Sequence, residues 1–315
     1  MKRFTARSFE ERTPRGEVVG HGYDASGVDL VTDGGRPTVG VRPPAVAGQF
    51  YAGDESGLHE QIENCFRHEY GPGRLEGLGG RKVTAVVSPH AGYPYSGPVA
   101  AHGYGVLASG PTPGSVVVLG PNHQGVGPDV AVSPHNHWRT PLGTAPVDGK
   151  LASAVVEESP VATFDERTHA GEHSLEVQIP FLQYCLEDVS VVPICLTRPG
   201  QDRARQFGSD LAAVIDRCGR DVAVVASTDL THYEGHEAAV AADEPVTEAI
   251  RRLDTDAVSE AVRGGHTMCG PWATVATLTA AKHLGVAGGD LLQYATSGET
   301  AGRRDRVVGY CSAVF

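Results

Sequence analysis

Short apolar runs alternate with longer amphipathic stretches along most of this 315-residue chain. The runs at 83–88, 116–119, 189–196 and 222–226 are rich in valine, leucine and isoleucine, which predicts buried strands. The stretch 202–218 carries apolar residues at helical spacing, which predicts an amphipathic helix. Strands that alternate with helices predict an α/β fold, in which helices flank a central sheet in a single domain.

The remaining elements follow from the same patterns and from helix caps. Asp54 or Ser56 is expected to cap the helix that is predicted at 56–70. Further helices are predicted at 56–70, 98–107, 150–158, 172–186, 237–253, 256–263 and 271–284. Further strands are predicted at 129–133, 291–295 and 307–315, and the segment 136–148 is predicted to be a loop. Pro180 is expected to kink or divide its helix. The strand at the end of the chain makes a mixed sheet more plausible than a parallel one.

Residues 1–40 differ from the rest of the chain because they are polar and show little apolar periodicity. We expect them to form a flexible N-terminal extension. The folded domain is then expected to cover residues 41–315, opening at Arg42-Pro43-Pro44.

Charge and cysteine content narrow the functional classes. The chain has 26 basic and 38 acidic residues and a formal net charge of −12, which argues against a broad nucleic-acid surface. None of the six cysteines forms a C-x-x-C pair. No apolar run reaches membrane-spanning length, and residues 1–20 lack a hydrophobic signal core. We expect a cytoplasmic protein that binds neither nucleic acid nor membrane.

Three turns that contain histidine directly follow predicted strands. Their sequences are Pro89-His90-Ala91-Gly92-Tyr93, Gly120-Pro121-Asn122-His123 and Ser227-Thr228-Asp229-Leu230-Thr231-His232. In an open α/β sheet, ligands bind outside the carboxyl ends of the strands. Imidazole and carboxylate groups at three such ends predict one converging site, which is either a metal centre or an acid–base centre.

Each of these residues also has a simpler explanation. His90 and His123 are equally compatible with ordinary surface loops. Asp229 and His232 would share one face if a helical turn began near residue 227, and Asp229 would then either orient His232 or cap the helix. Cys269 precedes Pro271, a good first helical residue, so the helix dipole would favour a metal-binding thiolate; an inert buried cysteine is the alternative.

Other histidines and one glutamate also lie near the predicted site in the sequence. His173 and Glu176 are spaced to share one helix face, where they would contact substrate or support the site; an ordinary charged helix start is the alternative. His135 and His137 are expected at the surface. Because G-x-S-x-G and P-loop motifs are absent, a serine hydrolase or a nucleotide-binding enzyme is not indicated.

In these segments the chain resembles the Memo family, including its prokaryotic members called AmmeMemoRadiSam system protein B. The resemblance runs in order over residues 42–315 and rests on the segments Ala47-Gly48-Gln49-Phe50-Tyr51, Pro89-His90-Ala91-Gly92-Tyr93, Gly120-Pro121-Asn122-His123, Trp138-Arg139-Thr140-Pro141-Leu142-Gly143, Glu172-His173-Ser174-Leu175-Glu176, Ser227-Thr228-Asp229 with His232, and Cys269-Gly270.

The resemblance implies a domain similar to class III extradiol dioxygenases. It implies a metal pocket at His90, His123 and Cys269, with Asp229 and His232 beside it and His232 as the acid–base residue. Extradiol dioxygenases use two histidines and a carboxylate on Fe(II), whereas the third ligand here would be a thiolate. A thiolate favours copper(I), zinc or thiolate-ligated iron, which differ from the Fe(II) site that cleaves catechols.

These observations lead to one main hypothesis and two alternatives. The main hypothesis is an iron- or copper-dependent oxidoreductase that acts on a small molecule or thiol with O2, with Asp229 holding His232 in one tautomer. Tyr51, Tyr93, Trp138 and Trp272 would line its pocket. The alternatives are a non-catalytic metal- or peptide-binding module, and a partner of a radical S-adenosylmethionine enzyme and an AMMECR-type protein, as the family name suggests.

Overall fold

The main sheet of the computed structural model runs through the middle of the molecule. The structure describes residues 9–12, 18–23, 29–33, 36–73 and 80–315. The strands of this sheet are β5 (Ala85–Ser88), β6 (Ser115–Pro121), β7 (Val130–Val132), β10 (Ala162–Phe164), β11 (Ser190–Leu196), β12 (Val222–Ser227), β13 (His232–Glu234), β14 (Asp290–Thr296) and β15 (Val307–Val314).

The strand order is β10-β7-β11-β6-β12-β5-β15-β13, and β14 also pairs with β15. The four central strands β11, β6, β12 and β5 are parallel to one another. On one side β7 runs antiparallel to β11, and on the other β15 runs antiparallel to β5. The mixed α/β sheet predicted from the sequence is therefore confirmed.

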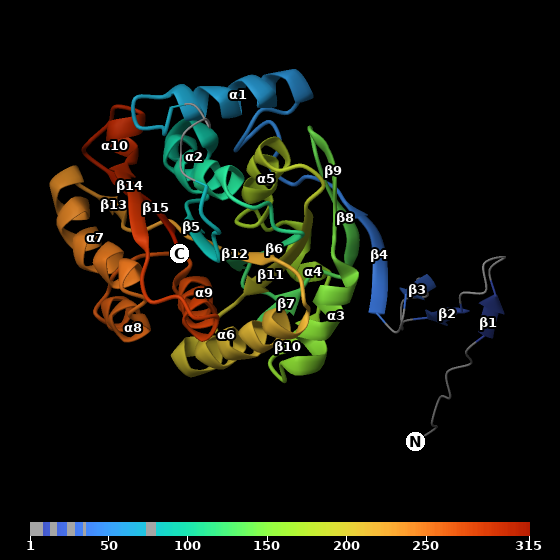
Figure 1. Cartoon of the computed structure of the whole chain (residues 1–315). Helices are drawn as coiled ribbons and strands as arrows, with labels where there is room; N and C mark the ends of the chain where they lie inside the picture. The colour runs from blue at the N-terminus through green and yellow to red at the C-terminus, as the bar shows by residue number, and fades with distance from the viewer. Residues whose placement is uncertain (1–8, 13–17, 24–28, 34–35, 74–79) are drawn as a thin grey trace.

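Helices cover both faces of this sheet (Figure 1). They are α1 (Glu55–Arg67), α2 (Tyr93–Ser109), α3 (Gly149–Glu158), α4 (Arg167–Ala170), α5 (Ile179–Cys185), α6 (Gly200–Arg217), α7 (His236–Arg251), α8 (Thr255–Arg263), α9 (Pro271–His283) and α10 (Ser297–Thr300). Helices α1, α2 and α5 lie on one face, and α3, α6 and α9 lie on the other. Among the described helices, none is both long and apolar enough to cross a membrane.

Side-chain alternation along the strands separates the two larger hydrophobic cores of the described residues. Val117 and Leu119 of β6 pack toward α6 and α9, whereas Val116 and Val118 pack toward α1 and α2. All four are fully buried. Because both faces of a central strand are covered by helices, such a strand is apolar throughout. This explains why the central strands were recognisable as continuous apolar runs.

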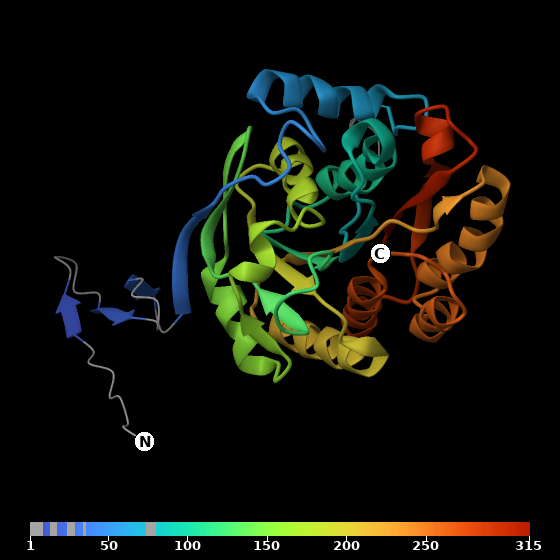
Figure 2. The same cartoon turned by 180° about the vertical axis from the view of Figure 1, so that it is seen from behind.

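A second sheet lies beside the main domain and contains the N-terminal strands. It has the order β1-β2-β3-β4-β8-β9, formed by β1 (Phe9–Arg12), β2 (Val18–Tyr23), β3 (Asp29–Asp33), β4 (Arg36–Arg42), β8 (His135–Thr140) and β9 (Gly143–Pro146). Figure 2 shows β1–β3 projecting beyond β4 at the edge of the molecule. The N-terminal extension thus contains strands where it is described. Outside the described residues lie 1–8, 13–17, 24–28 and 34–35 of this extension. The flexibility of the extension stays a prediction.

The segment 136–148 was predicted to be a loop, and this is wrong. It forms the hairpin β8–β9, and Trp138 on β8 is buried with its indole N–H donating to Ser133 Oγ at 3.0 Å. Pro141 belongs to the turn between the two strands. The prediction failed because turn residues in the middle of a hairpin make a short segment resemble a loop.

The predicted helix over 172–186 is also wrong in its first part. A 3₁₀ turn covers Glu176–Gln178, and the α-helix begins only at Ile179. The Glu172 carboxylate accepts the backbone N–H groups of His173 and Ser174, at 2.9 and 2.8 Å. A side chain that bonds its own neighbouring backbone competes with helix formation. Pro180 lies in the first turn of α5, so it divides the segment rather than kinking it.

His169 on α4 provides a prediction about acid stability. It is fully buried, and burial, with the Arg42 and His135 charges, lowers its pKa from 6.5 to about 3. The unfolded chain takes up a proton at this histidine below pH 6.5, whereas the folded protein does not until about pH 3. Stability therefore falls with acidification across this window, by about 2 kcal/mol between pH 6.5 and 5.

Urea unfolding of the metal-free protein at pH 7, 6 and 5 checks this contribution. His169→Gln should flatten the pH dependence by about that amount, while the exposed His59, replaced in the same way, should leave it unchanged. Equal slopes in His169→Gln and wild type would contradict the assignment.

Candidate metal centre

Three neighbouring parallel strands bring the predicted site residues together. In the order β6-β12-β5, the carboxyl end of β6 leads to His123, that of β12 to Asp229 and that of β5 to His90. The backbone N–H of His90 donates to Asp229 Oδ1 at 2.7 Å, which ties the β5 turn to the β12 turn. Adjacent parallel strands end at the same edge of a sheet, so the convergence predicted from the sequence is present.

Cys269 reaches the same place from the segment before α9. Its Sγ lies 3.0 Å from His90 Nε2 and accepts the backbone N–H of Asp229 at 3.2 Å. The next residue, Gly270, passes so close to β12 that an added Cβ would lie 2.5 Å from the Ser227 carbonyl oxygen. Glycine is therefore required at this position to let the cysteine approach the strand end.

His90, His123 and Cys269 form one cluster of possible metal ligands. One donor atom from each lies within 4.8 Å of the other two. His90 is buried, Cys269 is partly buried, and His123 lies at the exposed rim. The cluster is therefore closed on the protein side and open toward His123.

Hydrogen bonds fix the tautomer of His90. Ser227 Oγ donates to the Ser174 carbonyl oxygen and accepts from Gln178 Nε2, both at 2.7 Å. Since the hydroxyl proton is already used, Ser227 Oγ accepts the bond from His90 Nδ1 at 2.9 Å, and Nδ1 carries the proton. The lone pair of His90 is then on Nε2, the atom that faces Cys269.

Glu172 orients His123, and sequence reasoning missed this residue. One carboxylate oxygen lies 2.8 Å from His123 Nδ1, and the other accepts the His123 backbone N–H at 2.6 Å. Burial by itself raises the pKa of Glu172, but bonds and charge from His123 and the Ser174 N–H outweigh it and lower the pKa to about 2. A carboxylate behind a ligating histidine is a common supporting feature of metal sites. The available signals were its place beside His173 and its presence in the segment Glu172-His173-Ser174-Leu175-Glu176 of the resemblance.

His232 stands beside this cluster, but Asp229 does not fix its tautomer. His232 Nδ1 lies 2.8 and 3.0 Å from the carbonyl oxygens of Leu230 and Thr267, which only accept, so Nδ1 carries the proton and Nε2 is free to act as a base. Asp229, His232 and Cys269 do place one ligand atom each within 4.8 Å of one another. The expected helical turn is absent, because residues 228–231 are irregular and His232 begins β13.

A buried carboxylate on α7 connects the two loops that hold His232. Asp243 Oδ1 accepts the Thr231 N–H at 3.0 Å and lies 2.8 Å from His266 Nε2. Thr231 precedes His232 in the chain, and His266 precedes Thr267, whose hydroxyl accepts the His232 N–H at 2.8 Å. Asp243 is therefore a positioning group for His232.

Burial and mutual repulsion shape the charge state of the site. Burial, together with the neighbouring His123, His173 and His232, holds the pKa of His90 well below 6.5, so His90 is neutral. Burial and the Asp229 charge raise the pKa of the Cys269 thiol well above 9.0. Both effects oppose the thiolate that the sequence predicts from the dipole of α9. A cation bound at the cluster would reverse them.

The remaining candidates divide between this site and the interior. His173 belongs to the site: its ring stacks on His123, with ring centroids 4.5 Å apart, and contacts Phe50 at 4.6 Å. Glu176 and Tyr51 do not face the site, because Tyr51 Oη donates to Glu176 at 2.5 Å within the core. Tyr93 is also buried, and its hydroxyl donates to the Val177 carbonyl oxygen.

The predictions for Trp138 and His135 are wrong, because both side chains are buried away from the positions expected for them. Trp138 was expected to line the pocket, but it is buried under the Arg42 guanidinium, 4.1 Å from the ring centroid. His135 was expected at the surface, and it is buried beside Ser133. Trp272 does line the site cavity, as predicted.

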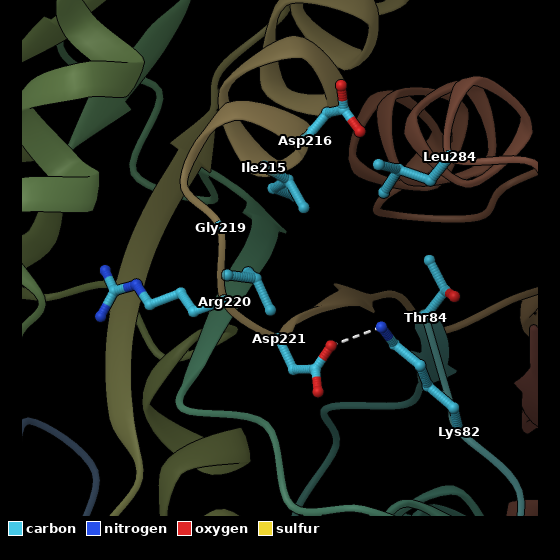
Figure 3. A pocket seen from close by; sticks show the side chains of 9 residues that line it. Lys82, Thr84, Ile215, Asp216, Gly219, Arg220, Asp221 and Leu284 are labelled. Atoms are coloured by element: carbon cyan, nitrogen blue, oxygen red, sulfur yellow. Dashed lines mark hydrogen bonds and ion pairs between the residues drawn. The ribbon is translucent and has the colours of Figure 1, made fainter.

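A cavity of about 400 Å³ opens onto the cluster at His123 and Cys269. Its other walls come from the loops after β6 and β11 and from the start of α9. A second cavity, of about 410 Å³, lies where β5 and β12 begin, at the opposite edge of the sheet. There Lys82 and Asp221 satisfy each other (Figure 3), and histidine and cysteine are absent from its lining. Of these two cavities, the first has the nitrogen and sulfur donors of a transition-metal site.

The residues present fit a transition-metal ion. His90 offers a lone pair on Nε2, His123 has Nε2 left when Glu172 holds Nδ1, and Cys269 offers Sγ. Nitrogen and sulfur donors held in this way suit copper, iron or zinc better than magnesium or calcium, which prefer oxygen.

Fold and site together define an α/β protein with a histidine–cysteine centre at the carboxyl edge of its sheet. The chain belongs to the Memo-like protein family, whose model matches residues 42–314.

Known relatives agree with this assignment. A MEMO1 family protein of Methanopyrus kandleri is 48% identical over 278 residues, covering 87% of this chain and 98% of the relative. One from Methanothermobacter thermautotrophicus is 44% identical over 272 residues, covering 86% and 98%. The crystal structure of an uncharacterized protein from Escherichia coli K12 shares the fold, with a TM-score of 0.52 and 16% identity over 74% of this chain and all of that one.

Proposed function

We propose that this protein is a metal-dependent oxidoreductase in which His90, His123 and Cys269 bind iron or copper. The observation that carries the proposal is the cluster itself, where three donor atoms lie within 4.8 Å of one another. Hydrogen bonds behind the ligands support the proposal, because Ser227 and Glu172 hold the Nδ1 atoms of the two histidines. Such support is typical of sites that bind a metal ion rather than of isolated surface histidines.

The chain's own residues then have separate roles in an oxidation. A bound iron or copper ion would supply electron transfer between a small molecule or thiol and O2. His232 accepts a proton from the substrate at Nε2, because the Leu230 and Thr267 carbonyls hold its Nδ1–H. Asp229, close to both His232 and Cys269, stabilises the resulting imidazolium by its charge. Electrons and protons leave the substrate together, and O2 takes them up as peroxide or water.

Elemental analysis by mass spectrometry tests the proposal. The protein is purified without chelators or affinity metals, next to Cys269→Ala and to Cys218→Ala, a control cysteine remote from the cluster. We expect near-stoichiometric iron or copper in wild type and in Cys218→Ala, and a loss of at least tenfold in Cys269→Ala. Oxygen consumption by the metal-loaded protein, with small thiols as probes, is the next measurement.

Two results would overturn the proposal. Absence of metal from the wild type, even after anaerobic reconstitution with Fe(II) and Cu(I), would leave the cluster without a metal role. Full occupancy by zinc, unaffected by iron or copper, would remove the redox chemistry. Either result would favour a binding module at the same cavity.

A further inference from the structure

The cavity beside the metal cluster has a positive wall. Arg198 follows the carboxyl end of β11, the strand next to β6, and lines the cavity with His123, Cys269 and Trp272. Among the side chains that the structure describes, no carboxylate or carbonyl group is paired with Arg198. By contrast, the nearby Arg203 and Arg205 on α6 are paired with Asp129 and Asp256.

An unpaired arginine at a cavity is notable in a chain with a net charge of −12. A guanidinium group matches a carboxylate with two parallel hydrogen bonds, so one arginine is enough to select that group. A phosphate dianion would call for more donors than this single side chain provides. Leu196, Met268 and Trp272 form an apolar and aromatic part of the remaining wall, and Asn122 and Thr197 add neutral polar groups. The volume of about 400 Å³ suits a small molecule rather than a folded partner.

We propose that the cavity binds a small planar carboxylate, with its carboxylate on Arg198 and its reacting end toward His123 and Cys269. This inference rests on the proposed function, because the cavity shares two of its walls with the metal cluster. Trp272 packs against the flat part of such a ligand. Arg198 is then a specificity-determining residue: it selects anionic substrates in a chain whose net charge is −12.

A matched pair of probes tests the charge requirement. Benzoate and benzamide have nearly the same shape, but only benzoate is an anion. Titrations of the metal-loaded protein are followed by tryptophan fluorescence, and the change on binding is assigned to Trp272, because the other tryptophan, Trp138, is buried under Arg42 and does not line the cavity. We expect saturable benzoate binding that weakens roughly 10- to 100-fold in Arg198→Gln, the loss of a charge-assisted bidentate bond. Benzamide should be weak and unaffected by the substitution, and phenyl phosphate should bind less tightly than benzoate.

The control is Arg203→Gln, which removes the same charge from the paired arginine on α6 and should leave benzoate binding unchanged. Quenching provides a second readout at constant ionic strength: Arg198→Gln should reduce quenching of Trp272 by iodide but not by neutral acrylamide. Equal benzoate affinities in Arg198→Gln and wild type, equal binding of benzamide, or no benzoate binding at all would overturn the inference. Metal content measured on the same preparations separates this failure from a failure of the metal site.

Discussion

Replacing His90 with alanine is expected to abolish metal binding while leaving the fold intact. His90 is the buried member of the cluster, its Nε2 lies 3.0 Å from Cys269 Sγ, and its Nδ1 is held by Ser227. Removing it leaves His123 and Cys269, and two ligands hold a transition metal far less tightly than three. We expect metal content to fall to background, and affinity measured by chelator competition to fall at least a hundredfold, more than the roughly 10–100-fold typical of a lost supporting group.

The fold should survive because His90 lies in a turn at the edge of the sheet. Its backbone N–H still donates to Asp229 in the variant. The control is His135→Ala, which removes an equally buried histidine from the second sheet and should leave metal content unchanged. Far-ultraviolet circular dichroism monitors folding of both variants. If folded His90→Ala retains stoichiometric metal, the assignment of this centre is wrong.

Glu176→Ala is expected to lower the free energy of unfolding by about 3–5 kcal/mol, the typical cost of breaking a buried ion pair from one side. Glu176 is fully buried and pairs with the buried Arg42 guanidinium. The carboxylate also accepts the backbone N–H groups of Ala45 and Val46, at 2.8 and 3.0 Å, and the Tyr51 hydroxyl. The substitution leaves all four donors without an acceptor in the core.

Urea unfolding of metal-free protein measures this loss. Glu158→Ala, which removes the partner of Arg217 from an exposed pair, serves as the comparison and should cost no more than about 1 kcal/mol. Metal bound per folded protein should stay the same in Glu176→Ala, because Glu176 does not face the cluster. If Glu176→Ala lowers the free energy of unfolding by less than about 1 kcal/mol, or loses metal without losing stability, Glu176 belongs to the metal site and not to the buried ion pair.

The contacts of Glu172 and Glu176 show how the segment 172–176 was misread. Its two carboxylates are four residues apart, and sequence reasoning chose Glu176 for the site and passed over Glu172. A helical spacing suggested that His173 and Glu176 share a face, but the chain turns at Glu172 before any helix begins. The choice between the two acids depends on contacts with Arg42 and His123, at sequence separations of 134 and 49 residues. Local pattern contains no information about such contacts.

The sequence by itself determined the α/β class, the central strands and most helices, because the apolar period of an element reflects only which of its faces is buried. It also determined that His90, His123 and Asp229 lie at strand ends, and parallel pairing then brings such ends to one edge. Tertiary structure alone decided the neighbour order β6-β12-β5, the approach of Cys269 over Gly270 and the groups that orient each imidazole. Those features depend on hydrogen bonds between residues as much as 179 positions apart, from His90 to Cys269, and only the folded chain brings such residues within bonding distance.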